Sequence, residues 1–470
     1  MRLGQLTGGP ETAQVTGFAI DHRKVAPGTV FGAFEGQRVN GEDFIPAAVA
    51  AGAIAVVARP EAKVEGAAHI ASDNPRAAFA GMAAKFFAPF PETAVAVTGT
   101  NGKTSTVEMT RQLWRMAGHH AASIGTLGVT TADERVVTGL TTPDVVTFLS
   151  NVGGLAREGV THLAFEASSH GLSQYRTEGV PVIAAAFTNL GRDHLDYHGD
   201  MAAYFTAKLR LFAEVLADEG TAVVWVDDPQ SERVIDLARA RRNKLVTVGE
   251  HGDTLRLVSR DPTLLGQGLV IAVDGREHKV TLPLIGAYQA ANALIAAGLV
   301  IATGGDVTQT IANLARLQPV RGRLERAVIA PSGAPVYVDY AHTADALEAA
   351  IAALRPHVAG RLILVFGAGG DRDHGKREPM GQVAAAQADV AIVTDDNPRG
   401  EDPAAIRAEI LEGAPGAIEI GDRRAAIARA ICMAGAEDIV LIAGKGHEQG
   451  QIVGDLVLPF DDVTVAREVA

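Results

Sequence analysis

The sequence predicts an α/β protein of three domains, each built around a mainly parallel sheet. At 470 residues, the chain is longer than one hydrophobic core usually supports. Its 47% hydrophobic content, with only 5% aromatic residues, suits central strands that are buried on both faces. Short apolar runs alternate with helical stretches along most of the chain, and this alternation is typical of parallel sheets.

Composition excludes several classes of protein. The chain has 42 basic and 55 acidic residues, so its formal charge of -13 argues against nucleic acid or an anionic membrane as its main partner. Its single cysteine, Cys432, excludes an intramolecular disulfide and a cysteine metal site, and we expect it to be buried filler. Met1–Pro10 lacks a signal pattern, and the longest apolar stretch, Ala293–Thr303, is too short to span a bilayer. We therefore expect a cytoplasmic protein.

The first predicted domain covers residues 1–90. An apolar strand at Ala53–Ala58 follows an Ala-rich helical stretch at Pro46–Ala51. The proline-punctuated segment Phe87–Pro91 then has the composition of a linker.

The second predicted domain covers residues 91–319. A pattern of strand, glycine-rich turn and helix starts at Ala94, and further buried strands are expected at Leu163–Glu166 and Ile183–Thr188. Alternating segments fill Thr221–Leu284, and a helix at Asn292–Ile301 closes the domain before a boundary near Pro319.

The third predicted domain covers residues 320–470. Short apolar strands separated by helical patterns predict a Rossmann-like, doubly wound sheet. These strands are Val336–Asp339, Leu362–Phe366, Val390–Thr394 and Ile439–Ala443.

A phosphate-binding loop follows the first strand of the second domain. Glycines allow backbone N–H groups to approach phosphate oxygens, a lysine neutralises the β and γ groups, and the following threonine can bind Mg²⁺. The loop departs from the full Walker pattern because Val97 stands at the first glycine position. The residues expected to bind ATP here are Gly99, Thr100, Asn101, Gly102, Lys103, Thr104 and Ser105.

This compact loop resembles that of the Mur ligase and folylpolyglutamate synthase superfamily, and further motifs occur in the order typical of Mur ligases. They are Thr141-Thr142-Pro143-Asp144, Glu166-Ala167-Ser168-Ser169-His170, Thr188-Asn189-Leu190, the run from Asp193 to Gly199, and Val338-Asp339-Tyr340-Ala341-His342. The resemblance implies an ATP-dependent, Mg²⁺-requiring ligase of peptidoglycan synthesis that activates a carboxylate as an acyl phosphate. We expect it to act as a monomer on small molecules.

Catalytic residues are expected near the phosphate loop. Glu166 and His194 follow two successive strands, where side chains that bind Mg²⁺ could converge on one edge of the sheet. With Lys103 they form the expected catalytic set, and Thr104 adds a metal ligand. The resemblance implies that Lys208 completes both sets as a carbamylated, metal-binding lysine, although a helical lysine alone is usually a solvated surface charge.

The resemblance also implies two sets of substrate contacts. A UDP-linked muramoyl dipeptide would meet Asp21, His22, Thr141, Thr142, Ser168, Gln174 and Arg176. ATP would also meet Asn292, Arg323, Asp339 and His342 by domain closure. Two positions depart from the family pattern: His22 replaces a more usual serine, and Tyr288-Gln289 replaces an aromatic-asparagine pair. Turn or cap chemistry is the alternative role for the dipeptide-facing residues.

The incoming amine is indicated by two loops that follow strands of the third domain. In the family, an Asp-Asn-Pro-Arg run marks enzymes that add meso-diaminopimelate, whose second carboxylate suits a bidentate arginine. The alternative for Asp-Asn-Pro alone is a helix cap and turn. The expected contacts are Arg372, Asp396, Asn397, Pro398, Arg399, Gly444 and Glu448.

Two other functions remain open. A lysine-adding muramoyl ligase or a folylpolyglutamate synthase would use the same chemistry, but Arg399 and Asp21-His22-Arg23 argue against both. A regulatory protein that binds nucleotide without catalysis would not need to retain the catalytic set together.

Overall fold

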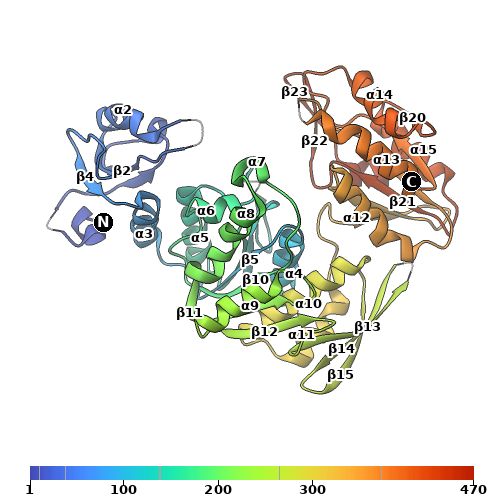
Figure 1. Ribbon diagram of the computed structural model, residues 1–470, viewed down its shortest axis with the longest axis horizontal. Helices are drawn as coiled ribbons and strands as arrows, with labels where there is room; N and C mark the ends of the chain where they lie inside the picture. Colours follow the sequence, from blue (N-terminus) through green and yellow to red (C-terminus); the bar gives the residue numbers. More distant parts are fainter. Residues whose placement is uncertain (10, 37–38, 137–138, 264, 372) are drawn as a thin grey trace. The chain divides into compact units, whose positions relative to one another are not determined.

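The computed structural model describes residues 1–9, 11–36, 39–136, 139–263, 265–371 and 373–470. The chain divides into two compact units, and Figure 1 labels their helices and strands. The first comprises Met1–Val248 and Gly298–Asp306, and the second comprises Gly249–Ala297 and Val307–Ala470. Domain boundaries near residues 90 and 319 remain a prediction.

The first unit begins with a parallel sheet in the order β1-β2-β3-β4. Its strands are Gly17–Ala19, Thr29–Gly32, Ala53–Ala58 and Ala68–Ala71. Helix α2 (Ile45–Ala50) lies one residue earlier than predicted. Helix α3 (Pro75–Phe87) begins where Asn74 accepts a hydrogen bond from the backbone of Ala77, and Pro75 suits its first turn. It ends at the start of the proline-rich segment.

The phosphate loop belongs to a larger sheet of the first unit. Strands β12, β11, β10, β5, β9 and β6 lie side by side in that order and run parallel, and β7 and β8 then continue antiparallel. Their bounds, from β5 to β12, are Thr93–Thr98, Ala121–Gly125, Gly128–Thr130, Arg135–Val136, His162–Glu166, Val182–Phe187, Leu216–Trp225 and Lys244–Gly249. The mainly apolar strands β5, β9 and β10 are buried throughout most of their length, as both-face packing requires.

Helices of this sheet position the loops that follow its strands. They are α4 (Lys103–Met116), α5 (Val145–Arg157), α6 (Ser169–Ser173), α7 (Leu195–His198), α8 (Met201–Arg210) and α9 (Ser231–Ala240). The predicted helix through Tyr204–Phe212 is present as α8, and the π-helical segment η3 (Leu211–Val215) continues it. Asp144 and Asp200 cap α5 and α8 by accepting backbone hydrogen bonds.

The second unit has an antiparallel part and a doubly wound part. The antiparallel strands β13, β14 and β15 span Leu255–Thr263, Gly266–Val273 and Arg276–Leu282. Helix α10 (Ala287–Ala302) follows, its residues from Gly298 onward belonging to the first unit, and helix α11 (Val307–Asn313) comes after it. The doubly wound sheet has the order β16-β17-β21-β18-β19-β20, in which only β16 runs antiparallel among the described residues. Its strands, from β16 to β21, are Glu325–Ile329, Pro335–Asp339, Leu362–Phe366, Val390–Val393, Ile418–Glu419 and Ile439–Ala443.

Alternating side chains on this sheet build two hydrophobic cores. Leu362, Leu364 and Phe366 pack with α12, α13 and α14, whereas Ile363 and Val365 pack with α15 and α16 on the opposite face. These helices are Ala344–Leu354, Arg377–Gln387, Pro403–Gly413, Arg423–Met433 and Asp462–Val469. A hairpin of β22 (Gly450–Val453) and β23 (Leu456–Pro459) precedes α16. The predicted doubly wound sheet is confirmed.

One expectation about burial was wrong. Cys432 is exposed on α15, because the core-facing positions of that helix are occupied by Ala426, Ile427, Ala430 and Ile431. Within the residues that the structure describes, no helix is long and apolar enough to cross a membrane.

Candidate active site

The phosphate loop connects β5 to α4, as the sequence predicts. Gly99 has a φ of 147°, and a Cβ there would lie 1.9 Å from Oγ1 of Thr188, so this position requires glycine. The segment after β10 braces the turn. Thr188 Oγ1 donates to the carbonyl oxygen of Asn101 at 2.6 Å, and the backbone N–H of Asn101 donates to Asn189 Oδ1 at 2.9 Å. The turn therefore has a defined position before α4 begins at Lys103.

Two lysine ammonium groups meet at this loop. Lys103 Nζ donates to the carbonyl oxygen of Gly99 at 2.9 Å, and Lys208 Nζ donates to the same oxygen at 2.7 Å. Lys208 is only 1% exposed and lies over the ring of Tyr204. Burial, and then the nearby ammonium of Lys103, lower the pKa of Lys208 well below its ordinary value. Lys208 is thus not a solvated surface charge.

Glu166 is a buried carboxylate at the end of β9. Its Oε1 accepts a hydrogen bond from the backbone N–H of Thr126 at 2.7 Å, and its Oε2 accepts one from Thr126 Oγ1 at 3.2 Å. A Cβ on Gly125 would lie 2.2 Å from Oε1, so glycine makes room for the carboxylate. These contacts hold an anionic group at the carboxyl edge of the sheet, next to the strand that leads to the phosphate loop.

The expected dipeptide contacts of the central sheet form one connected group with Glu166. Thr126 Oγ1 lies 3.1 Å from Thr141 Oγ1, and Thr142 Oγ1 donates to the backbone carbonyl of Glu166 at 2.9 Å. The backbone N–H of Ser168 donates to Thr142 Oγ1 at 3.1 Å.

Arg176 extends this group. Its NH1 donates to the carbonyl oxygen of Thr142 and its NH2 to Gln174 Oε1, each at 2.8 Å. Gln174 Nε2 in turn donates to the hydroxyl of Tyr197 at 2.9 Å. The structure therefore brings Thr141, Thr142, Ser168, Gln174 and Arg176 together.

His194 lies just before α7, in the loop that follows β10. It has a φ of 53°, its Nε2 is 3.4 Å from Asp193 Oδ2, and its ring centroid is 4.8 Å from that of His170. His170 belongs to the short helix after Glu166, so the two loops approach each other. In the described part of the chain, no group of three His, Cys, Asp or Glu side chains could hold a metal ion. A metal here would need ligands of another kind, such as phosphate oxygens, water or a modified lysine.

Asp21 and His22 lie in a turn after β1. Asp21 accepts from the backbone N–H of Arg23 at 3.0 Å and pairs with its guanidinium at 2.7 Å. The side chain of Arg23 is the main cause that lowers the pKa of Asp21 to about 2. The His22 ring stacks on Phe44 with centroids 4.4 Å apart. Asp21 therefore caps the short 3-10 helix η1 (His22–Lys24).

The four expected ATP contacts from the C-terminal half lie in the second unit. Asn292 Nδ2 donates to Gln289 Oε1 at 3.3 Å, and Gln289 Nε2 donates to the carbonyl oxygen of Arg323 at 2.8 Å. The Arg323 guanidinium lies over the ring of Tyr340. Gln289, which departs from the family pattern, thus links Asn292 to Arg323.

Asp339 and His342 lie beside this link. Asp339 Oδ2 accepts from the backbone N–H of Leu324 at 2.8 Å, and burial raises the Asp339 pKa. His342 Nδ1 lies 2.8 Å from the carbonyl oxygen of Tyr340. Asp339 and His342 are therefore connected to Arg323 through Leu324 and Tyr340.

The Asp-Asn-Pro-Arg loop follows β19, and the Gly-Lys-Gly loop follows β21. Asn397 Nδ2 donates to Glu448 Oε2 at 2.7 Å, and the fully buried Lys445 donates to Asn397 Oδ1 at 2.9 Å. Lys445 Nζ is also 3.6 Å from both Asp396 Oδ1 and Glu448 Oε2. Burial lowers the pKa of Lys445, although Asp396 opposes this effect. The two loops thus form one charged cluster.

The remaining expected contacts adjoin this cluster. Arg399 NH1 donates to the carbonyl oxygens of Gly370 at 2.9 Å and Asn397 at 3.3 Å. Gly444 has a φ of 116°, and a Cβ there would lie 2.3 Å from Asp396 Oδ2. The carbonyl oxygen of Pro398 accepts from the backbone N–H of Glu401 at 3.1 Å. Arg372 lies outside the described residues.

Comparison with known proteins identifies the family. Residues 14–86 match the model described as Mur ligase family, catalytic domain; residues 97–300 match the Mur ligase middle domain, and residues 322–446 match the Mur ligase glutamate ligase domain. The UDP-N-acetylmuramoyl-L-alanyl-D-glutamate--2,6-diaminopimelate ligase of Zymomonas mobilis is 62% identical over 458 residues, covering 97% of this chain and 94% of the relative. The chain belongs to the Mur ligase family.

Further relatives support the same assignment. A ligase with the same name from Bradyrhizobium diazoefficiens is 52% identical, with 96% of this chain and 93% of the relative covered. A solved structure of a UDP-N-acetylmuramoyl-L-alanyl-D-glutamate--2,6-diaminopimelate ligase has 33% identity and a TM-score of 0.76, and covers 100% of this chain and 98% of its own. This Mur ligase therefore has the three-domain α/β fold of its family.

Sequence reasoning missed several residues of this Mur ligase that organise the site. Thr126 holds Glu166, Lys445 links three polar side chains, and Gln289 connects Asn292 to Arg323. Lys445 was open to prediction, because a lysine directly after the apolar strand Ile439–Ala443 and between two glycines must lie at the carboxyl edge of the sheet. Thr126 gave no such signal, since Glu166 is distant in the sequence. Gln289 was noted only as a departure from the family pattern, and its contact with the distant Arg323 was not predicted.

Proposed function

We propose that this chain is an ATP-dependent ligase that adds meso-diaminopimelate to UDP-N-acetylmuramoyl-L-alanyl-D-glutamate in peptidoglycan precursor synthesis. The observation that carries this proposal is the charged cluster after β19 and β21, where Arg399 donates to the backbone of Asn397 and Lys445 joins Asn397 to Asp396 and Glu448. The cluster offers a cationic fork together with acidic side chains, which suits a zwitterion that carries an additional carboxylate. The names of the most similar relatives support the same substrates.

The chemistry requires activation of the dipeptide carboxylate. A carboxylate oxygen attacks the γ-phosphorus of ATP, ADP leaves, and the resulting acyl phosphate is attacked by the amine, which loses a proton as phosphate departs. The phosphate loop would bind the nucleotide through backbone N–H groups, and Lys103 would neutralise charge that develops during phosphoryl transfer. Breaking its hydrogen bonds to the carbonyl oxygens of Gly99, at 2.9 Å, and Thr100, at 2.8 Å, would allow Lys103 to reach the phosphates.

Magnesium suits the anionic and oxygen-bearing groups around this loop. Thr104, Glu166, His194 and a carbamate on Lys208 would hold it together with phosphate oxygens, and the ion would supply positive charge to the transferred phosphoryl group. The buried position of Lys208 at Gly99 supports the carbamate, because carbamylation needs an uncharged amine and the product needs neighbouring cations.

The remaining site residues would contact the uridine nucleotide, the muramoyl dipeptide and ATP. Asp21 and His22 would face the uridine nucleotide, and the group from Thr141 to Arg176 would hold the muramoyl dipeptide. Asn292, Arg323, Asp339 and His342 would contact ATP once the domains close. We propose that the enzyme works as a cytoplasmic monomer, with no nucleic acid or membrane partner.

Product analysis tests the proposal directly. The protein is incubated with ATP, Mg²⁺, the UDP-linked dipeptide and, in separate reactions, meso-diaminopimelate, lysine or glutamate. We expect a product whose mass equals the dipeptide plus diaminopimelate minus water, with one ADP formed per product. A preference for lysine would favour the lysine-adding alternative, and nucleotide binding without product would favour a non-catalytic regulator.

A further inference from the structure

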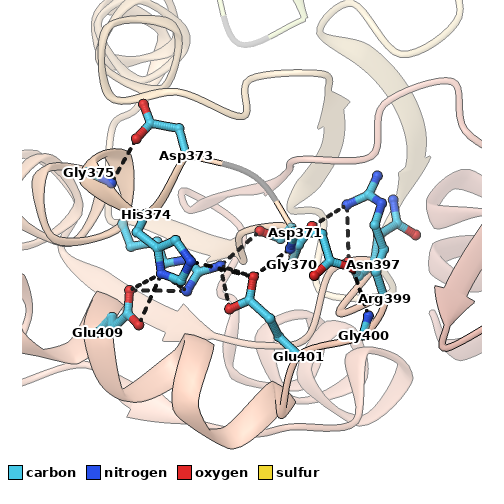
Figure 2. A network of polar contacts seen from close by, with 12 residues as sticks. Gly370, Asp371, Asp373, His374, Gly375, Asn397, Arg399, Gly400, Glu401 and Glu409 are labelled. Atoms are coloured by element: carbon cyan, nitrogen blue, oxygen red, sulfur yellow. Dashed lines mark hydrogen bonds and ion pairs between the residues drawn. The ribbon is translucent and has the colours of Figure 1, made fainter.

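An ionic network around a buried arginine adjoins the proposed diaminopimelate cluster (Figure 2). Arg377, the first residue of α13, is fully buried. Its NH2 donates to both carboxylate oxygens of Glu401 at 2.9 Å, and its NH1 donates to Glu409 Oε2 at 3.1 Å. A buried guanidinium is costly unless charged partners satisfy it, so these carboxylates hold it in one place.

Glu401 and Asp371 connect two loops that follow neighbouring strands. The Glu401 carboxylate accepts a hydrogen bond from the backbone N–H of Asp371 in the loop after β18. In return, Asp371 Oδ2 accepts from the backbone N–H of Gly400 at 3.0 Å in the loop after β19. The backbone N–H of Asp371 and then Arg377 lower the pKa of Glu401, so this carboxylate stays ionised. The loop after β18 and the loop after β19 therefore each accept a hydrogen bond from the other.

This reciprocal connection determines where Arg399 lies. Arg399 NH1 donates to the carbonyl oxygen of Gly370, the residue directly before Asp371, at 2.9 Å. The backbone N–H of Gly370 donates to the carbonyl oxygen of Asn397 at 3.1 Å. A shift of the loop after β18 would consequently move the acceptor that orients the Arg399 guanidinium.

The backbone of these loops requires such support. Asp371, Asn397 and Arg399 have φ values of 52°, 46° and 52°, in the left-handed region that residues with a Cβ disfavour. Such conformations persist only where surrounding contacts compensate for them, and they concentrate at ligand-binding sites. Without the connection through Glu401, both loops could relax to ordinary backbone conformations.

We propose that Arg377, Glu401 and Asp371 are positioning residues that set the Arg399 guanidinium for the second carboxylate of the incoming amino acid. This inference rests on the proposed function. Arg377 holds Glu401, Glu401 holds Asp371, and the carbonyl oxygen before Asp371 holds Arg399. Discrimination between diaminopimelate and lysine therefore depends on side chains that need not touch either substrate.

The same sheet offers a matched control at its opposite edge. Arg361 and Asp438 directly precede β18 and β21, and they form an ion pair at 2.7 Å. Asp438 Oδ1 also accepts from the backbone N–H of Arg361 at 2.7 Å. Asp438→Asn therefore weakens an arginine–carboxylate contact of the same sheet without touching the loops at its carboxyl edge.

Steady-state kinetics of full-length variants tests the proposal. Glu401→Gln removes the charge and keeps the shape, and we expect KM for meso-diaminopimelate to rise about tenfold, as loss of a charge-assisted contact predicts. KM for ATP and for the UDP-linked dipeptide should stay near the wild-type values, and the preference for diaminopimelate over lysine should shrink. Glu401→Asp should restore part of that preference.

The outcomes that would overturn this inference differ from the outcome that would overturn the proposed function. An unchanged preference in folded Glu401→Gln, or an equal loss of preference in Asp438→Asn, would overturn the inference. If Glu401→Gln does not fold, Asp371→Gly provides the same comparison, because it removes the acceptor for Gly400 and tolerates the left-handed backbone. A wild-type enzyme that joins the dipeptide to lysine and never to diaminopimelate would instead overturn the proposed function.

Discussion

The buried Nζ of Lys208 donates a hydrogen bond to the carbonyl oxygen of Gly99, the first glycine of the phosphate loop, across 2.7 Å. The same oxygen accepts from Lys103, so two cationic side chains converge on one backbone atom. An unmodified pair of ammonium groups repels, whereas a carbamate on Lys208 would attract Lys103 and Mg²⁺. This relationship leads to the first prediction.

Lys208→Ala should abolish ligation, and formate or acetate should restore part of the activity. The alanine leaves a space at the phosphate loop that a small carboxylate can fill in place of the carbamate. Product formation is measured with and without each acid, and chloride at equal ionic strength serves as a control. The exposed Lys244→Ala should keep wild-type activity with or without formate. Near wild-type activity of Lys208→Ala without additive would contradict the carbamate hypothesis.

Lys103→Ala and Glu166→Ala should each lower kcat by about a hundredfold or more, because each residue stabilises charge during phosphoryl transfer. ADP release under saturating substrates measures the loss, and circular dichroism checks that each variant is folded. Glu158→Ala, at an exposed glutamate just after α5, is the control. A folded variant with unchanged turnover would remove that residue from the catalytic set.

Arg399→Ala should raise KM for meso-diaminopimelate steeply and leave KM for ATP and the dipeptide nearly unchanged. Loss of a bidentate contact to a carboxylate should cost on the order of 2 to 4 kcal/mol. Lysine should remain a poor substrate, because Asp396, Asn397 and Glu448 would still suit a zwitterion. The measurement is the ratio of kcat/KM for the two amino acids, with exposed Arg429→Ala as the control. An unchanged ratio would show that Arg399 does not read the second carboxylate.

Protonation of His162, on β9, should make the first unit less stable in mild acid. Burial, and then the nearby His119, lower the pKa of His162 from 6.5 to about 4. Between these values the unfolded chain binds a proton that the folded protein does not, so the free energy of unfolding should fall as pH decreases from 6.5 toward 4. Urea unfolding at several pH values measures the slope. His162→Gln should reduce the slope, whereas exposed His69→Gln should not; equal slopes in wild type and His162→Gln would disprove this origin.

Much of the fold was open to prediction because strands and helices are encoded locally. The structure has β3, β18 and β21 with the predicted bounds, since each is a continuous apolar run beside turn-forming residues. The π-helical segment η3 was not predicted, because the helix α8 that it continues has an ordinary helical pattern in the sequence. The prediction that Cys432 is buried was wrong, since one apolar residue does not reveal which side of a helix faces the core.

By itself, the sequence determined the order of strand, phosphate loop and helix, and it placed Asp396, Asn397 and Glu448 after strands of one parallel sheet. Chain direction and apolar runs suffice for that, because parallel strands end at the same edge. Only the tertiary structure decided that Lys208 is buried at Gly99, and that Arg377 pairs with Glu401 across 24 residues of sequence. Such pairs depend on which strands become neighbours and on how helices pack over them, and no local pattern of residues specifies either.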